Sequence, residues 1–154
     1  MKPLVRRPLA VAASAVLATA GALAVVAPPA QAATPVRIVK IWYDSPGSDT
    51  RSAASLNAEY VMLKNVTTSA RTMTGWTVRD AAGHRYTFGT LRIGAGKTVV
   101  LHTGRGTNTS TNRYWQSGNY IWNNDRDTAY LRDARGALMQ TCAYNSTKVD
   151  YRIC

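Results

Sequence analysis

Apolar and polar residues alternate with a period of two along most of this chain, and turn-forming residues separate the alternating segments. Such alternation is typical of half-buried β-strands, and no helical period extends over a useful length between residues 34 and 144. Short strands that recur about every ten residues are typical of a β-sandwich, so we predict an all-β fold. The segments with a strand pattern are residues 36–43, 59–65, 76–79, 85–88, 98–102, 120–122, 128–132 and 138–144.

One short pattern occurs twice, in residues 78–83 (VRDAAG) and 131–136 (LRDARG). In each copy Asp opens a turn, where its side chain can accept hydrogen bonds from the turn's own backbone. Gly closes each turn, because glycine tolerates the positive φ that the exit often needs. The repeat therefore predicts two β-hairpins, in which Arg79 and Arg132 face solvent. Trp76, which precedes the first copy, is predicted to pack in the core.

Residues 1–32 have the composition of an export signal. A basic start is followed by an apolar run over residues 9–27, then by Pro28-Pro29 and the small-residue motif Ala30-Gln31-Ala32. This order predicts a cleavable signal peptide with cleavage before Ala33. The apolar run is also about long enough for a membrane anchor, which is the alternative. Two consecutive arginines near the start leave the Sec and twin-arginine routes both open.

No second apolar run follows, so we expect a secreted protein without a membrane span after signal cleavage. Residues 33–154 are short enough to form a single domain. Its strand-rich core spans residues 36–144, and a tail of residues 142–154 follows. Cys142 and Cys154 are the only cysteines, and an even count in an exported chain predicts a disulfide bond.

The chain is strongly basic. Without the signal's three basic residues, 16 of the 19 remain against 8 acidic ones, a net charge of +8. A basic exported protein is attracted to anionic polymers such as wall phosphates, acidic glycans and free nucleic acid. The alternative is that outward strand positions carry arginine only for solubility. The arginines of the hairpins and of the loops near them are Arg79, Arg85, Arg105, Arg113, Arg126, Arg132 and Arg135.

A polar segment, residues 104–113, and the aromatic residues after it form the candidate ligand surface. Gly104-Arg105-Gly106-Thr107 can cradle an anion, or its glycines can allow a tight strand exit. Four aromatic residues lie within residues 114–122; exposed rings would stack on sugars or bases, and buried rings would anchor a loop. We favour burial for Trp122 and, after it, for Trp115. The candidate surface consists of Arg105, Arg113, Tyr114, Trp115 and Tyr120.

Few residues of the chain suggest catalysis. His84 and His102 are the only histidines, and no Gly-x-Ser-x-Gly elbow, His-Glu-x-x-His motif or His/Cys ligand cluster is present. Residues 123–127 imitate the start of a calcium loop, but Thr128 stands where such a loop needs Gly and the closing Glu is missing. We predict a polar turn there, and no catalytic, cofactor-binding or metal-binding residues and no cofactor.

Several short segments follow one another in a recognisable order. They are residues 56–65 (LNAEYVMLKN), 75–80 (GWTVRD), 83–88 (GHRYTF), 100–106 (VLHTGRG), 122–124 (WNN) and 127–133 (DTAYLRD), with Gly136. Together these segments resemble a lamin tail domain of the bacterial secreted type, over about residues 36–144. The resemblance implies an immunoglobulin-like β-sandwich that acts as a binding or attachment module, with no common set of catalytic residues. One departure is Arg126, where this family often has Gly, which affects only the local turn.

These observations lead to one functional expectation and two alternatives. We expect a secreted, monomeric, non-enzymatic binding or attachment module for an anionic polymer or carbohydrate outside the cell or in its wall. Binding of extracellular DNA is a variant of this hypothesis. A small secreted hydrolase of unrecognised type is the second alternative, and it would require a cleft that holds a histidine near a hydroxyl and a carboxylate.

Overall fold

The computed structural model describes residues 34–154 and confirms the all-β prediction. Strands dominate this part of the chain, and the one helix in it is short. The elements are β1 (Val36–Trp42), α1 (Ala53–Ala58), β2 (Tyr60–Asn65), β3 (Arg71–Thr72), β4 (Thr77–Arg79), β5 (Arg85–Thr87), β6 (Arg92–Ile93), β7 (Thr98–His102), β8 (Asn112–Tyr114), β9 (Arg126–Arg132), β10 (Leu138–Asn145) and β11 (Tyr151–Ile153).

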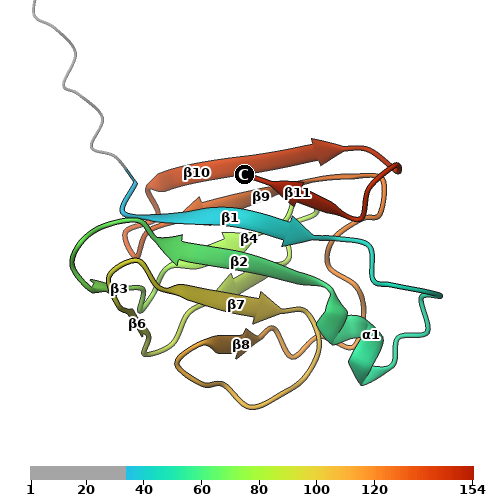
Figure 1. Ribbon diagram of the computed structural model, residues 1–154, viewed down its shortest axis with the longest axis horizontal. Helices are drawn as coiled ribbons and strands as arrows, with labels where there is room; N and C mark the ends of the chain where they lie inside the picture. Colours follow the sequence, from blue (N-terminus) through green and yellow to red (C-terminus); the bar gives the residue numbers. More distant parts are fainter. Residues whose placement is uncertain (1–33) are drawn as a thin grey trace, which may run out of the picture. The chain divides into compact units, whose positions relative to one another are not determined.

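Two larger sheets form a sandwich (Figure 1). The five-stranded sheet has the order β11-β1-β2-β7-β8, and the four-stranded sheet has the order β10-β9-β4-β5. Strands β3 and β6 form a small separate pair. Neighbouring strands are antiparallel in every pair of the described residues except β7 and β8, which run parallel.

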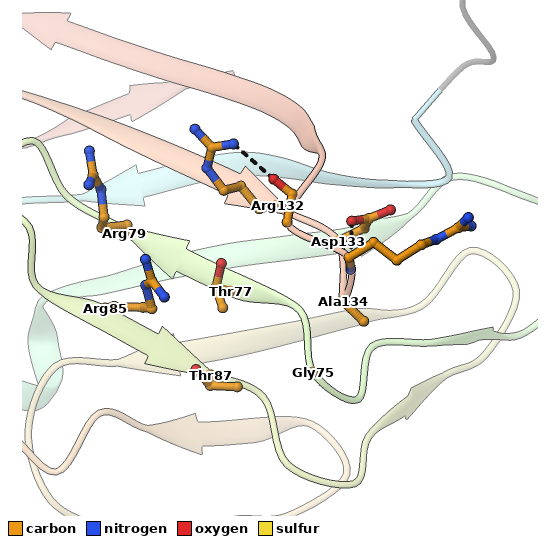
Figure 2. Close-up of a pocket in the computed structure, with 10 residues that line it drawn as sticks. Gly75, Thr77, Arg79, Arg85, Thr87, Arg132, Asp133 and Ala134 are labelled. Atoms are coloured by element: carbon orange, nitrogen blue, oxygen red, sulfur yellow. Dashed lines mark hydrogen bonds between the residues drawn. The ribbon is translucent and has the colours of Figure 1, made fainter.

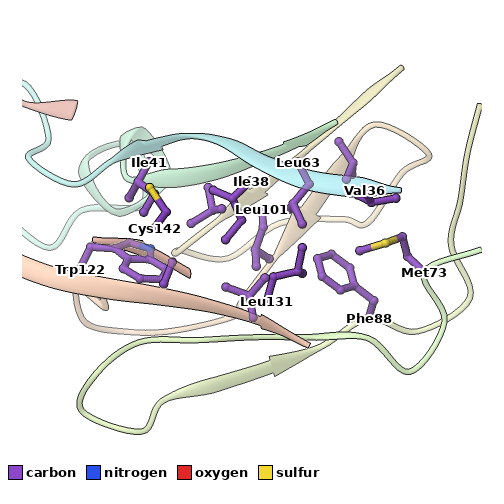
Figure 3. Close-up of a cluster of buried hydrophobic side chains, with 14 of the residues drawn as sticks. Val36, Ile38, Ile41, Leu63, Met73, Phe88, Leu101, Trp122, Leu131 and Cys142 are labelled. Carbon is purple, nitrogen blue, oxygen red and sulfur yellow. The ribbon is translucent and has the colours of Figure 1, made fainter. Parts of the chain in front are cut away.

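The core lies between the two larger sheets (Figure 3). Because side chains alternate across a strand, every second residue enters this layer. In β7, for example, Val99 and Leu101 are buried while His102 points outward. Trp122 is buried, as we favoured from the sequence, and Trp76 packs against the core from a half-buried position, as predicted.

Both predicted hairpins are present, and their turns are built as the sequence indicates. Oδ1 of Asp80 accepts hydrogen bonds from the backbone N–H groups of Gly83 and His84, both at 2.7 Å. Oδ1 of Asp133 accepts in the same way from two N–H groups of its own turn, both at 2.9 Å. Gly83 (φ 105°) and Gly136 (φ 85°) lie in the left-handed region that favours glycine.

One local prediction was wrong, and one segment without a predicted element forms a short helix; Glu59 lies at both places. Residues 53–58 form a short helix, α1, and the Ser52 hydroxyl caps its start by accepting a hydrogen bond from the N–H group of Ser55. Residues 120–122 are not a strand, because the N–H groups of Ile121 and Trp122 donate to the carboxylate of Glu59 at 2.9 and 3.3 Å instead of to a neighbouring strand. Glu59 itself ends α1.

Two further segments are more ordered than the sequence suggested. The predicted loop of residues 104–113 ends in β8, which pairs with β7. The C-terminal tail contains β11, which pairs with β1 at the edge of the five-stranded sheet. The predicted disulfide bond is confirmed: it joins Cys142, on β10, to Cys154, which follows β11. The bond therefore ties the two sheets of the sandwich together.

The predicted signal peptide and its cleavage site lie outside the described residues, 34–154. In the described part of the chain, no helix has the length and apolar character that crossing a membrane would require.

Candidate functional site

Four arginines gather on the outer face of the four-stranded sheet, around a concavity of about 590 Å³. Figure 2 shows the guanidinium groups of Arg79, Arg85 and Arg132 on one side of the sheet. Arg135 comes from the turn between β9 and β10 and also lines the concavity. We call the set of Arg79, Arg85, Arg132 and Arg135 the arginine basin.

The strand register places like charges against each other. Arg79 on β4 lies directly opposite Arg85 on β5. Like charges that face each other across an antiparallel pair destabilise the sheet. On its other side, Arg79 lies opposite Tyr130 of β9. The register therefore lowers the stability of the sheet unless an anion lies between the guanidinium groups of Arg79 and Arg85.

No carboxylate in the described part of the chain forms an ion pair with a basin arginine. Within residues 34–154, ion pairs join His84 to Asp80 and Arg126 to Asp125, and none includes a basin arginine. Asp133 also lines the concavity, but its Oδ1 already accepts the two turn N–H groups. The arginine basin therefore concentrates positive charge, and the resulting electrostatic potential attracts anions.

Some of the basin side chains are held in place by neutral partners. The guanidinium carbon of Arg79 lies 5.3 Å from the ring centroid of Tyr130, within the range of a cation–π contact. Nη1 of Arg132 donates to the backbone oxygen of Gly136 at 2.9 Å. Nε of Arg79 is buried and has no hydrogen-bond partner among the described residues. The other N–H groups of these planar guanidinium groups can donate paired hydrogen bonds to two oxygens of a phosphate or carboxylate.

The two arginines of the sequence-predicted surface lie apart from the basin and have different surroundings. Arg105 is exposed and lines a smaller cavity of about 210 Å³ together with Arg51. Nη2 of Arg113 donates to the backbone oxygen of Thr90 at 2.8 Å, which fixes its direction. The glycine at 104 is required by close packing, since a Cβ there would lie 2.4 Å from Oδ1 of Asn57 on α1.

The aromatic residues of that predicted surface are partly buried. Trp115 packs against the core and meets Trp122 edge to face, with ring centroids 6.2 Å apart. The hydroxyl of Tyr120 lies 2.5 Å from the hydroxyl of Ser55, which docks this loop onto α1. Tyr114 stacks on His102 on the outer face of the five-stranded sheet. No ligand contact tests the surface, which stays a prediction.

Neither histidine has the surroundings that the hydrolase alternative requires. Nδ1 of His84 lies 2.5 Å from Oδ2 of Asp80, with no hydroxyl bonded to the ring. The ring nitrogens of His102 contact the backbone oxygen of Asn57 and the side-chain oxygen of Asn112, and neither is a carboxylate. The arrangement within residues 34–154 gives this alternative no support.

Glu59 is a second electrostatic feature, one to which the sequence assigned no role. Its side chain is fully buried and has no basic partner within ion-pair distance in residues 34–154. Oε1 accepts from the Thr103 hydroxyl at 2.6 Å and from the N–H groups of Ile121 and Trp122. Burial raises the pKa of Glu59 to about 7, although these three hydrogen bonds favour the ionised form.

The basin was only partly visible in the sequence. The repeated hairpins placed Arg79 and Arg132 on outward positions, and Arg85 and Arg135 were noted as basic. The missing information was that β4 and β9 are neighbours, which joins the two hairpins into one sheet. A repeated Arg at the same outward position of two hairpins was the available signal.

Two facing, largely antiparallel sheets that enclose one core define an immunoglobulin-like β-sandwich. Domains with this fold are often used for binding, and the fold alone does not assign a function. The family model of the lamin tail domain matches residues 29–146, and the chain belongs to this family. No curated protein matches the chain. The resemblance predicted from the sequence is thereby confirmed, while the bacterial secreted type stays a prediction.

Proposed function

We propose that this protein is an exported, non-enzymatic module that attaches to a phosphate-bearing polymer outside the cell. The observation that carries the proposal is the arginine basin. Its four arginines line one concavity, and none of them forms an ion pair with a carboxylate among the described residues. The basin's charges are concentrated, whereas arginines kept for solubility alone are expected to be interspersed with acidic residues.

The chemistry of the basin suits a chain that carries phosphate groups. Thr77 and Thr87 place hydroxyl groups between the arginines, so the concavity offers both charged and neutral donors. A phosphodiester presents oxygens along a chain, and several guanidinium groups on one sheet can contact it together. Wall phosphate polymers and extracellular DNA share this chemistry, and the experiment below separates them.

Export belongs to the same proposal. A disulfide such as Cys142–Cys154 forms and persists in oxidising compartments outside the cytosol, which supports secretion. Cleavage between Ala32 and Ala33 is the expected processing step. N-terminal sequencing of the exported protein tests it, and an intact Met1 in a membrane fraction would favour the anchor alternative.

Three double variants with the same loss of charge test the basin. Arg85→Gln/Arg135→Gln changes exposed basin side chains, and Arg37→Gln/Arg92→Gln changes exposed arginines elsewhere. The third variant replaces the two arginines of the sequence-predicted surface by glutamine. Binding to purified wall polymer, duplex DNA and a neutral glycan is measured at several salt concentrations.

We expect only the basin variant to lose most of its polyanion binding. The slope of log affinity against log salt should become shallower by about two, since two phosphate contacts are removed. The melting temperature should stay or rise slightly, because the opposition between Arg79 and Arg85 is relieved. Equal losses in all three variants would show that only net charge matters, and a loss confined to the third would move the site to Arg105 and Arg113.

A further inference from the structure

A row of aromatic rings crosses the outer face of the five-stranded sheet, with one ring from each strand. The pairing register aligns them: Trp42 lies opposite Tyr151 on one side and Tyr60 on the other. His102 lies opposite Tyr60 and, on the parallel strand β8, opposite Tyr114. The strand order in Figure 1 therefore gives the order of the rings. The aromatic row consists of Tyr151, Trp42, Tyr60, His102 and Tyr114.

The rings form a continuous surface. The ring centroid of Trp42 lies 5.4 Å from that of Tyr151 and 6.1 Å from that of Tyr60. The centroid of His102 lies 6.0 Å from that of Tyr60 and 5.0 Å from that of Tyr114. All five side chains are partly exposed, and Tyr151, on the edge strand, is 40% exposed. A contiguous exposed aromatic surface on a soluble domain marks an interaction site.

The row also presents unused hydrogen-bonding groups. Among the described residues, the hydroxyls of Tyr60, Tyr114 and Tyr151 have no hydrogen-bond partner, unlike those of Tyr43 and Tyr144, which are bonded to backbone oxygens. A tyrosine offers an apolar ring and a free hydroxyl, so it suits a ligand whose apolar and polar groups lie close together.

The strand positions directly beside the row carry little charge, and the exposed Lys64 and Arg37 lie one position further along β2 and β1. The next positions along the five strands are mostly apolar, and Lys40 is the only charged side chain in the two rows together. Its ammonium group lies 4.4 Å from the ring centroid of Trp42 and 4.3 Å from that of Tyr151, where the rings stabilise it. This face therefore differs sharply from the arginine basin. The residues of the second row are Ile153, Lys40, Met62, Val100 and Asn112.

These features discriminate between possible occupants. A single-stranded nucleic acid requires a basic groove along its backbone, and Lys40, the single charged side chain beside the rings, does not provide it. A second copy of the chain would bury three tyrosine hydroxyls without an assigned partner, which is costly. A sugar ring has aliphatic C–H faces for the aromatic rings and hydroxyls for the tyrosines. An uncharged polysaccharide therefore matches the aromatic rings, the tyrosine hydroxyls and the low charge of this surface.

We propose that the aromatic row is a second binding site, for an uncharged polysaccharide chain that lies across the five strands. The inference does not rest on the proposed function, because it uses the other sheet of the sandwich. Since the two outer faces point in opposite directions, this site and the proposed function together allow one molecule to hold a glycan on one face and a phosphate-bearing polymer on the other. The protein then connects two polymers.

The test uses the disulfide-bonded protein in native gels that contain hydroxyethyl cellulose as the neutral probe. Trp42→Ala removes the second ring of the row, and Tyr60→Phe/Tyr151→Phe removes two hydroxyls while keeping the rings. Tyr130→Phe is the matched control for polysaccharide binding, since Tyr130 is a partly exposed tyrosine on the other sheet and the variant keeps the ring that contacts Arg79. Binding of the same proteins to DNA at low salt is measured in parallel.

We expect the wild-type protein to be retarded by the polysaccharide at low and at high salt. Trp42→Ala should weaken this binding on the order of tenfold and the double Phe variant severalfold, while the control and the DNA binding stay unchanged. Amide NMR resonances of β1, β2 and β11 in the wild-type protein should shift on addition of the probe. This measurement tests the site even if Trp42→Ala does not fold. Absence of retardation, an equal loss in Tyr130→Phe, or dimerisation through this face would overturn the proposal.

Discussion

The buried carboxyl group of Glu59 makes a quantitative prediction about stability and pH. The perturbation is Glu59→Gln, which imitates the protonated acid. The amide keeps an oxygen for the N–H groups of Ile121 and Trp122, and its NH₂ group takes the place of Oε2, which accepts no hydrogen bond among the described residues. The variant therefore removes the titration and keeps the shape.

The magnitude follows from the shifted pKa. Burial raises the pKa of Glu59 from an ordinary value of 4.5 to about 7 in the folded protein. Because the folded-state pKa is the higher one, the stabilisation is fully present below pH 4.5 and is lost as the pH rises to about 7. A difference of this size corresponds to roughly 3 kcal/mol of unfolding free energy.

The assay is urea denaturation of wild type and variant at pH 4.5 and pH 8, followed by tryptophan fluorescence. Comparing the two proteins at each pH cancels the contributions of all other titrating groups. The stability of Glu59→Gln relative to wild type should increase by about 3 kcal/mol between the two pH values. Asp150→Asn, at an exposed carboxylate, is the control and should change by less than about 0.5 kcal/mol.

Parallel pH dependences of wild type and Glu59→Gln would refute this reasoning. Carbon-13 NMR titration of the Glu59 carboxyl group provides an independent measurement that needs no variant. A pKa near 4.5 in the folded protein would show that water or a cation reaches the group.

The remaining predictions concern the disulfide and the turns. Reduction of Cys142–Cys154, which are 12 residues apart, should lower the unfolding free energy by about 3 kcal/mol and leave the sandwich folded; loss of cooperative unfolding would contradict this. Asp133→Ala should cost about 1–2 kcal/mol by thermal denaturation, because two turn N–H groups lose their acceptor. Asp80→Ala should cost more, since Asp80 is fully buried and also holds the His84 ring; equal costs would contradict the argument from burial.

The local sequence pattern was sufficient to predict most of the strands and both hairpins. Alternation shows which face of a strand is apolar, and Asp and Gly at fixed places in a turn define its hydrogen bonds and its φ. The disulfide was equally accessible, because only two cysteines exist. Local pattern failed at residues 120–122, where the buried Glu59, far away in sequence, takes the backbone N–H groups that a strand would use.

The sequence by itself therefore determined most of the strands, both hairpins, the class of fold and the net charge of this protein. Only the tertiary structure decided which outward side chains meet. The pairing of β4 with β9 brings Arg79 and Arg132 into one basin, and the order β11-β1-β2-β7-β8 aligns five rings from distant parts of the chain. The physical reason is that side chains alternate along a strand with a period of two, whichever strand lies next to it. Which strands become neighbours, and in which register they pair, depends on packing and hydrogen bonding across the whole domain.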